Sequence, residues 1–133
     1  PGGKLILTTP NKVQSLTRNP WHVREYLVSE LEILYTKCGF KLESLGVFGN
    51  NKVAQYLVKN KESISKITRW DIFNLQYNLP RTWLQVPYDI LNRMNRKKVA
   101  AAHLDITKNI TTEDFSLAKA NNDCLDLFYI GTK

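Results

Sequence analysis

The feature that most constrains the fold is the opening of the chain, where a Pro-Gly-Gly turn leads straight into an aliphatic run. Residues 4–9 read Lys-Leu-Ile-Leu-Thr-Thr, and Pro10 then removes a backbone donor and ends the strand. Because Leu5, Ile6 and Leu7 do not alternate with polar residues, they predict a strand buried on both faces. Strands of this kind belong to parallel sheets covered by helices, so the sequence predicts an open α/β fold.

A capped helix and a second strand are expected after the first strand. Ser29 and Glu32 form a capping-box pattern, and Gly39 is placed to end the helix that they begin. Residues 40–48 then predict a second strand, in which Gly46 and Gly49 indicate a bend or a close backbone approach near its end. Strand, helix and strand in this order predict a right-handed βαβ unit.

A long segment with helical spacing separates the second strand from the last one. Its apolar and aromatic residues predict either two helices or one kinked helix, with a break near residues 60–63, and then a further helix that Pro87 interrupts. Residues 125–130 predict a final strand that pairs antiparallel with the second strand. The expected parts are a strand-helix-strand part at residues 1–50, a helical insertion or cap at residues 51–122 and the final strand at residues 123–133.

The formal net charge of +7 bears on the kind of partner. A balance this basic fits a nucleic acid, an anionic surface or an acidic substrate, and it also fits a solvated face. Arginines interleaved with aromatic residues in the insertion fit a small packing subdomain, a lid over a binding site or an interfacial helix. The basic clusters are Lys59, Lys61, Lys66 and Arg69, then Arg93, Arg96, Lys97 and Lys98.

The two cysteines and two histidines argue against a metal site. Cys38 and Cys124 have no partner at ligand spacing, so we interpret them as buried, reduced thiols of a cytoplasmic protein. His103 lies in a weakly patterned stretch and is expected to be exposed. The apolar runs are far shorter than the roughly 20 residues of a transmembrane helix, so no transmembrane segment is predicted.

The loop beyond the first strand carries the side chains best suited to bind a substrate. In open α/β sheets ligands bind beyond the carboxyl ends of the strands, where this loop begins. Two of its residues have alternative interpretations. His22 either acts as a base or braces the loop near Glu25, and Arg24 either pairs with Glu25 or grips an acidic ligand. The candidate substrate-binding residues are Asn11, Trp21, His22, Arg24 and Tyr26.

Three stretches together resemble class I S-adenosylmethionine-dependent methyltransferases. Their order and spacing resemble the fifth strand, the helix leading to the sixth strand, and the antiparallel seventh strand of that family. The resemblance implies the C-terminal half of a Rossmann-like methyltransferase sheet, with residues 51–122 inserted where the family usually has a plain hairpin. The stretches are Pro1-Gly2-Gly3 through Asn11, then His22-x-x-Glu25-Tyr26 with Glu30-Leu31 and Cys38-Gly39-Phe40, and finally residues 124–130.

The resemblance also implies a function. It implies methyl transfer from S-adenosylmethionine to a small molecule or another acceptor, with His22 as the candidate catalytic residue. The family's cofactor motifs, a glycine-rich turn and an acidic residue ending a strand, are absent from this sequence. We therefore expect them to precede Pro1 and expect this chain alone to be inactive.

The same resemblance implies two kinds of partner. One is a small-molecule acceptor, and the other is the upstream half of the same protein, or a second copy, along the exposed edge of the first strand. The alternative function is a non-enzymatic basic interaction module that binds nucleic acid or an anionic surface. We favour the methyltransferase interpretation, because a basic composition is common whereas the order of these motifs is not.

Overall fold

The computed structural model describes residues 2–69, 71, 73–102 and 108–133, and it divides the chain into two units. The predicted exposure of His103 concerns a residue outside these ranges. The two units interleave along the chain, because the loop after the first strand leaves one unit and returns to it. The sheet unit comprises Pro1–Ser15, Arg24–Asn50 and Glu113–Lys133, and the helical unit comprises Leu16–Val23 and Asn51–Thr112.

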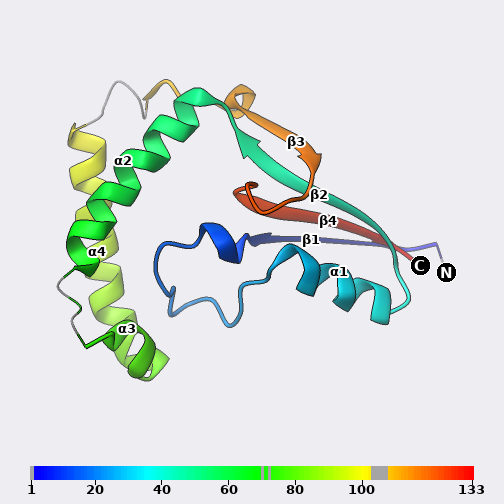
Figure 1. Ribbon diagram of the computed structural model, residues 1–133, viewed down its shortest axis with the longest axis horizontal. Helices are drawn as coiled ribbons and strands as arrows, with labels where there is room; N and C mark the ends of the chain where they lie inside the picture. Colours follow the sequence, from blue (N-terminus) through cyan, green and yellow to red (C-terminus); the bar gives the residue numbers. More distant parts are fainter. Residues whose placement is uncertain (1, 70, 72, 103–107) are drawn as a thin grey trace. The chain divides into compact units, whose positions relative to one another are not determined.

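The sheet unit is a mixed α/β structure built on a four-stranded antiparallel sheet (Figure 1). The strand order is β1-β4-β2-β3, and every neighbouring pair is antiparallel. The expected parallel pairing is therefore wrong for this chain, because β4 lies between β1 and β2 and bonds to both. β1 and β2 nevertheless run in the same direction. The strands are β1 (Lys4–Pro10), β2 (Lys41–Gly49), β3 (Phe115–Lys119) and β4 (Asp126–Thr132).

The prediction that β1 is buried on both faces is wrong. Leu5 is 43% exposed and Ile6 is 59% exposed. Within the described residues β1 has a neighbour on one side only, so it is an edge strand of this sheet. Leu7, paired with Tyr129, packs against the core, whereas Ile6 lies on the opposite face.

Helix α1 (Val28–Lys37) packs on one face of the sheet. The sequence predicts its end correctly but not its start. The expected start at Ser29 is wrong. The amide of Leu27 donates to Glu30 Oε2 at 3.0 Å, so the helix begins at Val28. The predicted end at Gly39 is confirmed, because this residue has a φ of 75° and lets Phe40 N donate to Tyr35 O at 3.1 Å.

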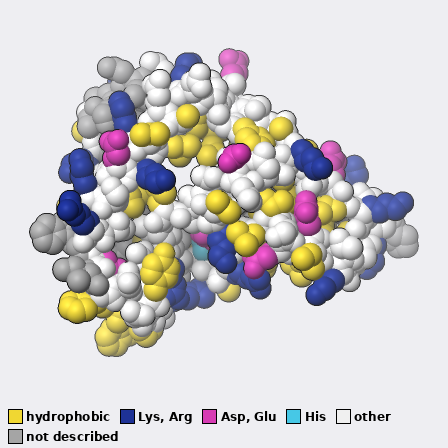
Figure 2. All heavy atoms as spheres, in the orientation of Figure 1, with side chains coloured by type: hydrophobic (Ala, Val, Ile, Leu, Met, Phe, Trp, Pro, Cys, Tyr) yellow, Lys and Arg dark blue, Asp and Glu magenta, His cyan; other side chains and the backbone are white. Residues whose placement is uncertain are grey.

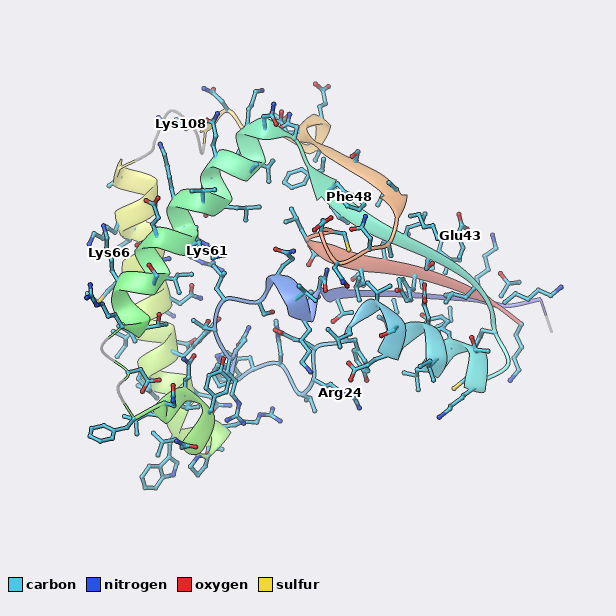
Figure 3. The ribbon with its side chains drawn as sticks, in the orientation of Figure 1. Arg24, Glu43, Phe48, Lys61, Lys66 and Lys108 are labelled. Carbon is cyan, nitrogen blue, oxygen red and sulfur yellow. The ribbon has the colours of Figure 1, made fainter. Side chains whose placement is uncertain are left out.

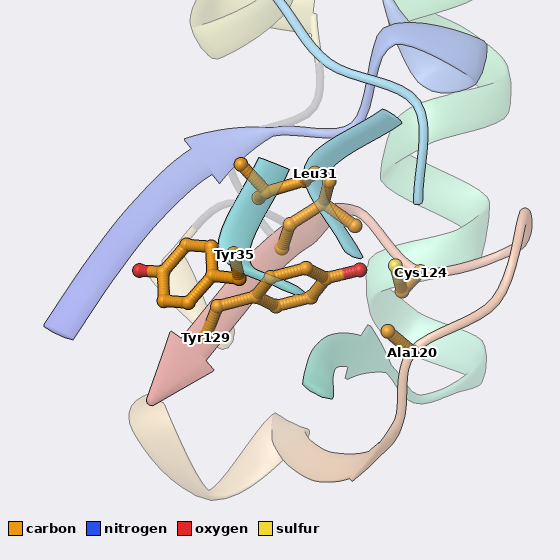
Figure 4. Packing of buried hydrophobic residues seen from close by; sticks show 6 residues of the cluster. Leu31, Tyr35, Ala120, Cys124 and Tyr129 are labelled. Atoms are coloured by element: carbon orange, nitrogen blue, oxygen red, sulfur yellow. The ribbon is translucent and has the colours of Figure 1, made fainter. Parts of the chain in front are cut away.

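The core of the sheet unit lies between α1 and β4 (Figure 4). Tyr35 and Tyr129 pack edge to face, with ring centroids 5.9 Å apart, and Leu31 is fully buried beside them. Cys124 is buried as predicted, but the burial predicted for Cys38 is wrong. Cys38 is the C-cap of α1, so its thiol lies beyond the packed turns of the helix.

Gly46 confirms the predicted close approach in β2. A Cβ atom built on this residue would lie 2.5 Å from Cys124 Cβ and 3.3 Å from Ala120 Cα. The loop between β3 and β4 therefore crosses β2 where a side chain is missing. The sequence does not predict β3, because its residues fall within the expected helical insertion.

The helical unit contains α2 (Asn51–Thr68), α3 (Leu75–Asn78) and α4 (Arg81–Ala102). The predicted break near residues 60–63 is wrong, because α2 is continuous through this stretch. Asn60 and Ser63 instead bond to Asn95 of α4, at 3.0 and 2.6 Å. The predicted interruption at Pro87 is also wrong. Proline removes one hydrogen bond, and the other turns of this 22-residue helix remain to hold it.

Candidate functional site

Asn11 fixes the end of β1 to the loop that precedes β4. Its side chain is fully buried, and its Nδ2 donates to the carbonyls of Cys124 at 2.8 Å and Asn122 at 3.2 Å. Its Oδ1 accepts from the amide of Val13 at 3.2 Å. In the structure, the side-chain amide of Asn11 makes these hydrogen bonds to backbone groups of the protein. Its substrate-binding role stays a prediction.

Arg24 and Tyr26 lie in the sheet unit, close to the start of α1. The Arg24 guanidinium lies 4.8 Å from the centroid of the Tyr26 ring, and its Nη2 is 3.3 Å from Glu30 Oε1. Arg24 thus pairs with Glu30, and the Ser15 hydroxyl donates to Glu25. The pair of Arg24 with Glu25 stays a prediction. Lys12 N donates to Tyr26 O at 3.1 Å, which holds Tyr26 beside the end of β1.

The carboxylate of Glu30 is stabilised in its ionised form. The hydrogen bond from the Leu27 amide lowers the pKa of Glu30, and the positive charges of Lys12 and Arg24 lower it further. Glu30 thus stays ionised and keeps the Arg24 side chain beside the Tyr26 ring.

Trp21 and His22 lie in the helical unit, on a tight turn that begins at Asn19. His22 N donates to Asn19 O at 3.2 Å, and Trp21 N donates to Asn19 Oδ1 at 3.0 Å. The Asn19 amide nitrogen lies 3.0 Å from His22 Nε2, so this ring nitrogen accepts when the imidazole is neutral. The turn predicted from Asn-Pro is confirmed, and it orients the imidazole.

The same turn is anchored to α4. Pro20 is fully buried, and its carbonyl accepts from Arg81 Nε at 3.2 Å. Trp21 Nε1 donates to Asp89 Oδ1 at 3.0 Å. The structure thus groups Trp21 and His22 with the helices, and it groups Asn11, Arg24 and Tyr26 with the sheet.

A cavity of about 400 Å³ lies within the helical unit, and the sequence did not reveal it. Its wall is mostly apolar and is shared by all three helices and the segment at residues 17–18. No local pattern predicts such a cavity, because residues far apart in the chain line it. The lining comprises Thr17, Arg18, Ile64, Thr68, Asp71, Leu75, Gln76, Leu79, Leu84, Pro87, Tyr88, Leu91, Asn92 and Asn95.

The basic excess of the chain is confined to the helical unit. By sequence this unit holds twelve of the nineteen Lys and Arg residues and four of the twelve Asp and Glu residues. Its formal net charge is therefore +8, whereas that of the sheet unit is −1. Figure 2 shows Lys and Arg side chains on both units, and Lys61 and Lys66 extend from α2 in Figure 3.

Comparisons with known proteins assign no family to this chain. No family model, curated protein or solved structure matches it. In the part of the chain that the structure describes, no three His, Cys, Asp or Glu residues are grouped so that they could hold a metal ion. None of the described helices combines the length and the apolar character needed to cross a membrane.

Proposed function

We propose that this chain is the acceptor-side portion of an S-adenosylmethionine-dependent methyltransferase. The observation that carries the proposal is the position of β4, which runs antiparallel between β1 and β2. β1 and β2 run in the same direction on either side of it. The sequence resemblance implies a seventh strand that lies antiparallel beside the sixth, and β4 lies antiparallel beside β2 in this way.

The apolar second face of the sheet is consistent with the proposal. Ile6, Phe128 and Ile130 lie on the face opposite Tyr129, together with Leu45 of β2. α1, the α-helix that the structure describes in the sheet unit, packs on the Tyr129 face. An antiparallel sheet can leave one face in water, whereas the doubly covered sheet of the proposal would bury these side chains.

The described residues do not by themselves form a cofactor site. Neither a glycine-rich turn after a first strand nor an acidic residue ending a second strand is present in the sequence. The side chain of Asn11, at the end of β1, is already hydrogen-bonded to backbone groups. The proposal therefore assigns S-adenosylmethionine to polypeptide outside this chain.

In this proposal the segment after β1 contributes the acceptor side. The enzyme's main task in methyl transfer is to align the acceptor and exclude water. Asn11 fixes where the segment leaves the sheet, and the turn at Asn19 orients the His22 imidazole. His22 is the residue that would take a proton from an acceptor that must lose one.

Calorimetry with S-adenosylmethionine tests the proposal. We expect the 133-residue chain to show no binding, and we expect binding once the polypeptide encoded upstream of Pro1 is joined to it. Absence of binding by the longer polypeptide would contradict the proposal. Binding by the 133-residue chain would contradict the assignment of the cofactor to upstream residues.

His22→Ala tests the catalytic role in the longer polypeptide. Loss of a general base should slow methyl transfer by about 10²–10⁴-fold, because such a group contributes that much. S-adenosylmethionine binding, measured by the same calorimetry, should be unchanged. Asn19→Ala is the matched variant, since it removes one hydrogen bond of the imidazole but keeps the ring, and it should give a smaller loss. A His22→Ala enzyme with the wild-type rate would exclude the role.

The charge of the helical unit favours a second candidate, a basic module that binds single-stranded nucleic acid. A net charge of +8 with arginines among exposed aromatic residues such as Trp83 and Tyr77 suits phosphate contacts and base stacking. Binding of an oligonucleotide that weakens steeply as salt rises would support this candidate. Salt-insensitive or undetectable binding would exclude it.

A further inference from the structure

We propose that the cavity of the helical unit binds a small amphipathic carboxylic acid, with its chain against the apolar wall and its head at Arg18. The inference rests on the proposed function only where it names this acid as the methyl acceptor. The binding itself is argued from the cavity. The segment that follows β1 supplies Thr17 and Arg18 to the wall, so the predicted acceptor loop takes part in the cavity.

The wall determines the apolar part of the ligand. Ile64 of α2, Leu75 of α3 and Leu84 of α4 face the same space, together with Leu91 and Pro87. A cavity of about 400 Å³ lies in the size range of small-molecule sites. At about 30 Å³ for each water-sized group, it holds a molecule of roughly a dozen non-hydrogen atoms. A short aliphatic or single-ring body fits this description.

Arg18 determines the head of the ligand. Its Nη1 donates to the carbonyls of Gln76 and Tyr77, both at 3.2 Å, so the guanidinium is held at the wall. Its Nε and Nη2 groups have no acceptor within the described residues. A half-buried guanidinium with donors to spare binds a carboxylate in two-pronged fashion.

The other polar groups of the wall are consistent with an anionic head. Asp71 is already used, because its Oδ1 accepts from Leu75 N at 2.6 Å and its Oδ2 from Gln76 N at 3.2 Å. Asn92 makes no hydrogen bond to any residue that the structure describes, so its amide is available to a ligand. The unit's net charge of +8 attracts anions and disfavours cations.

Calorimetry on the full chain with three ten-carbon probes tests the head group. We expect decanoate to bind, decanol to bind about tenfold or more weakly, and decyltrimethylammonium to show no binding. The shared chain isolates the contribution of the head. Equal binding of decanoate and decanol would overturn the role of Arg18, and absence of decanoate binding would overturn the proposal.

Two variants place the probe in the cavity. Arg18→Met should weaken decanoate binding about 10–100-fold and leave decanol binding unchanged, so retained decanol binding shows that the unit is folded. Arg96→Met, with the same charge change at an exposed α4 position outside the cavity, is the control and should bind decanoate normally. Leu84→Trp should fill the cavity and abolish binding of both probes. Wild-type decanoate binding by Arg18→Met or by Leu84→Trp would contradict the assignment.

This test separates the inference from the proposed function. A longer polypeptide that fails to bind S-adenosylmethionine would end the methyltransferase proposal and leave decanoate binding intact. A chain that does not bind decanoate would end the inference and leave the cofactor result intact. Only decanoate binding together with cofactor binding supports an apolar acid as the methyl acceptor.

Discussion

Gly46 shows how the absence of one side chain allows β2 to pass beside the loop before β4. A Cβ atom there would lie 2.5 Å from Cys124 Cβ and 2.8 Å from its Sγ. We therefore expect Gly46→Ala to lower the free energy of unfolding by about 1–3 kcal/mol, because a crowded core must shift. Urea denaturation measures this change. Gly3→Ala, where a Cβ atom meets nothing within 4 Å, should change stability by less than about 0.5 kcal/mol. Equal effects of the two substitutions would contradict the packing.

Glu30 links the stability of the sheet unit to acid pH. The Leu27 amide holds the pKa of the folded-state carboxyl below its usual value. The stabilisation is thus present above the unfolded-state pKa and is lost as the pH falls through the folded-state pKa. Glu30→Gln should therefore flatten the loss of stability between neutral pH and about pH 3, as followed by urea midpoints. A variant with the full wild-type acid dependence would show that Glu30 contributes nothing to it.

At the scale of elements, the contact between α2 and α4 depends on Asn95. This buried side chain accepts from Ser63 Oγ at 2.6 Å and donates to Asn60 Oδ1 at 3.0 Å. Asn95→Ala should cost about 1–3 kcal/mol in the free energy of unfolding, because both partners lose their hydrogen bond. Asn92→Ala, one turn earlier on the same helix, removes an amide without a partner among the described residues and should cost about 0.5 kcal/mol or less. A smaller loss for Asn95→Ala than for Asn92→Ala would contradict the role of the network.

The sequence predicts an element well where a local rule determines it. Gly39 ends α1 because of its positive φ, and residues 40–48 form β2 as expected. The sequence does not predict an element whose structure depends on packing against residues far away in the chain. β3 is a strand because it pairs with β2, and α4 continues through Pro87 despite the local rule. The cavity could not be predicted at all, because its lining is assembled from four separate segments.

At the scale of the whole molecule, charge and architecture divide in the same way. The sheet unit is close to neutral and carries the strand order on which the proposed function rests. The helical unit carries the positive charge and the cavity. In the proposal, the sheet unit continues a larger cofactor-binding sheet and the helical unit selects the acceptor.

Hydrogen exchange of the β1 amides tests the central claim, that β1 is an interior strand of a larger sheet. In the 133-residue chain β1 has β4 as its one neighbour in the described sheet, so its outward amides should exchange rapidly. With the upstream polypeptide attached, the same amides should exchange at least about tenfold more slowly, because a new strand bonds to that edge. Unchanged exchange across β1 in the longer polypeptide would contradict the account.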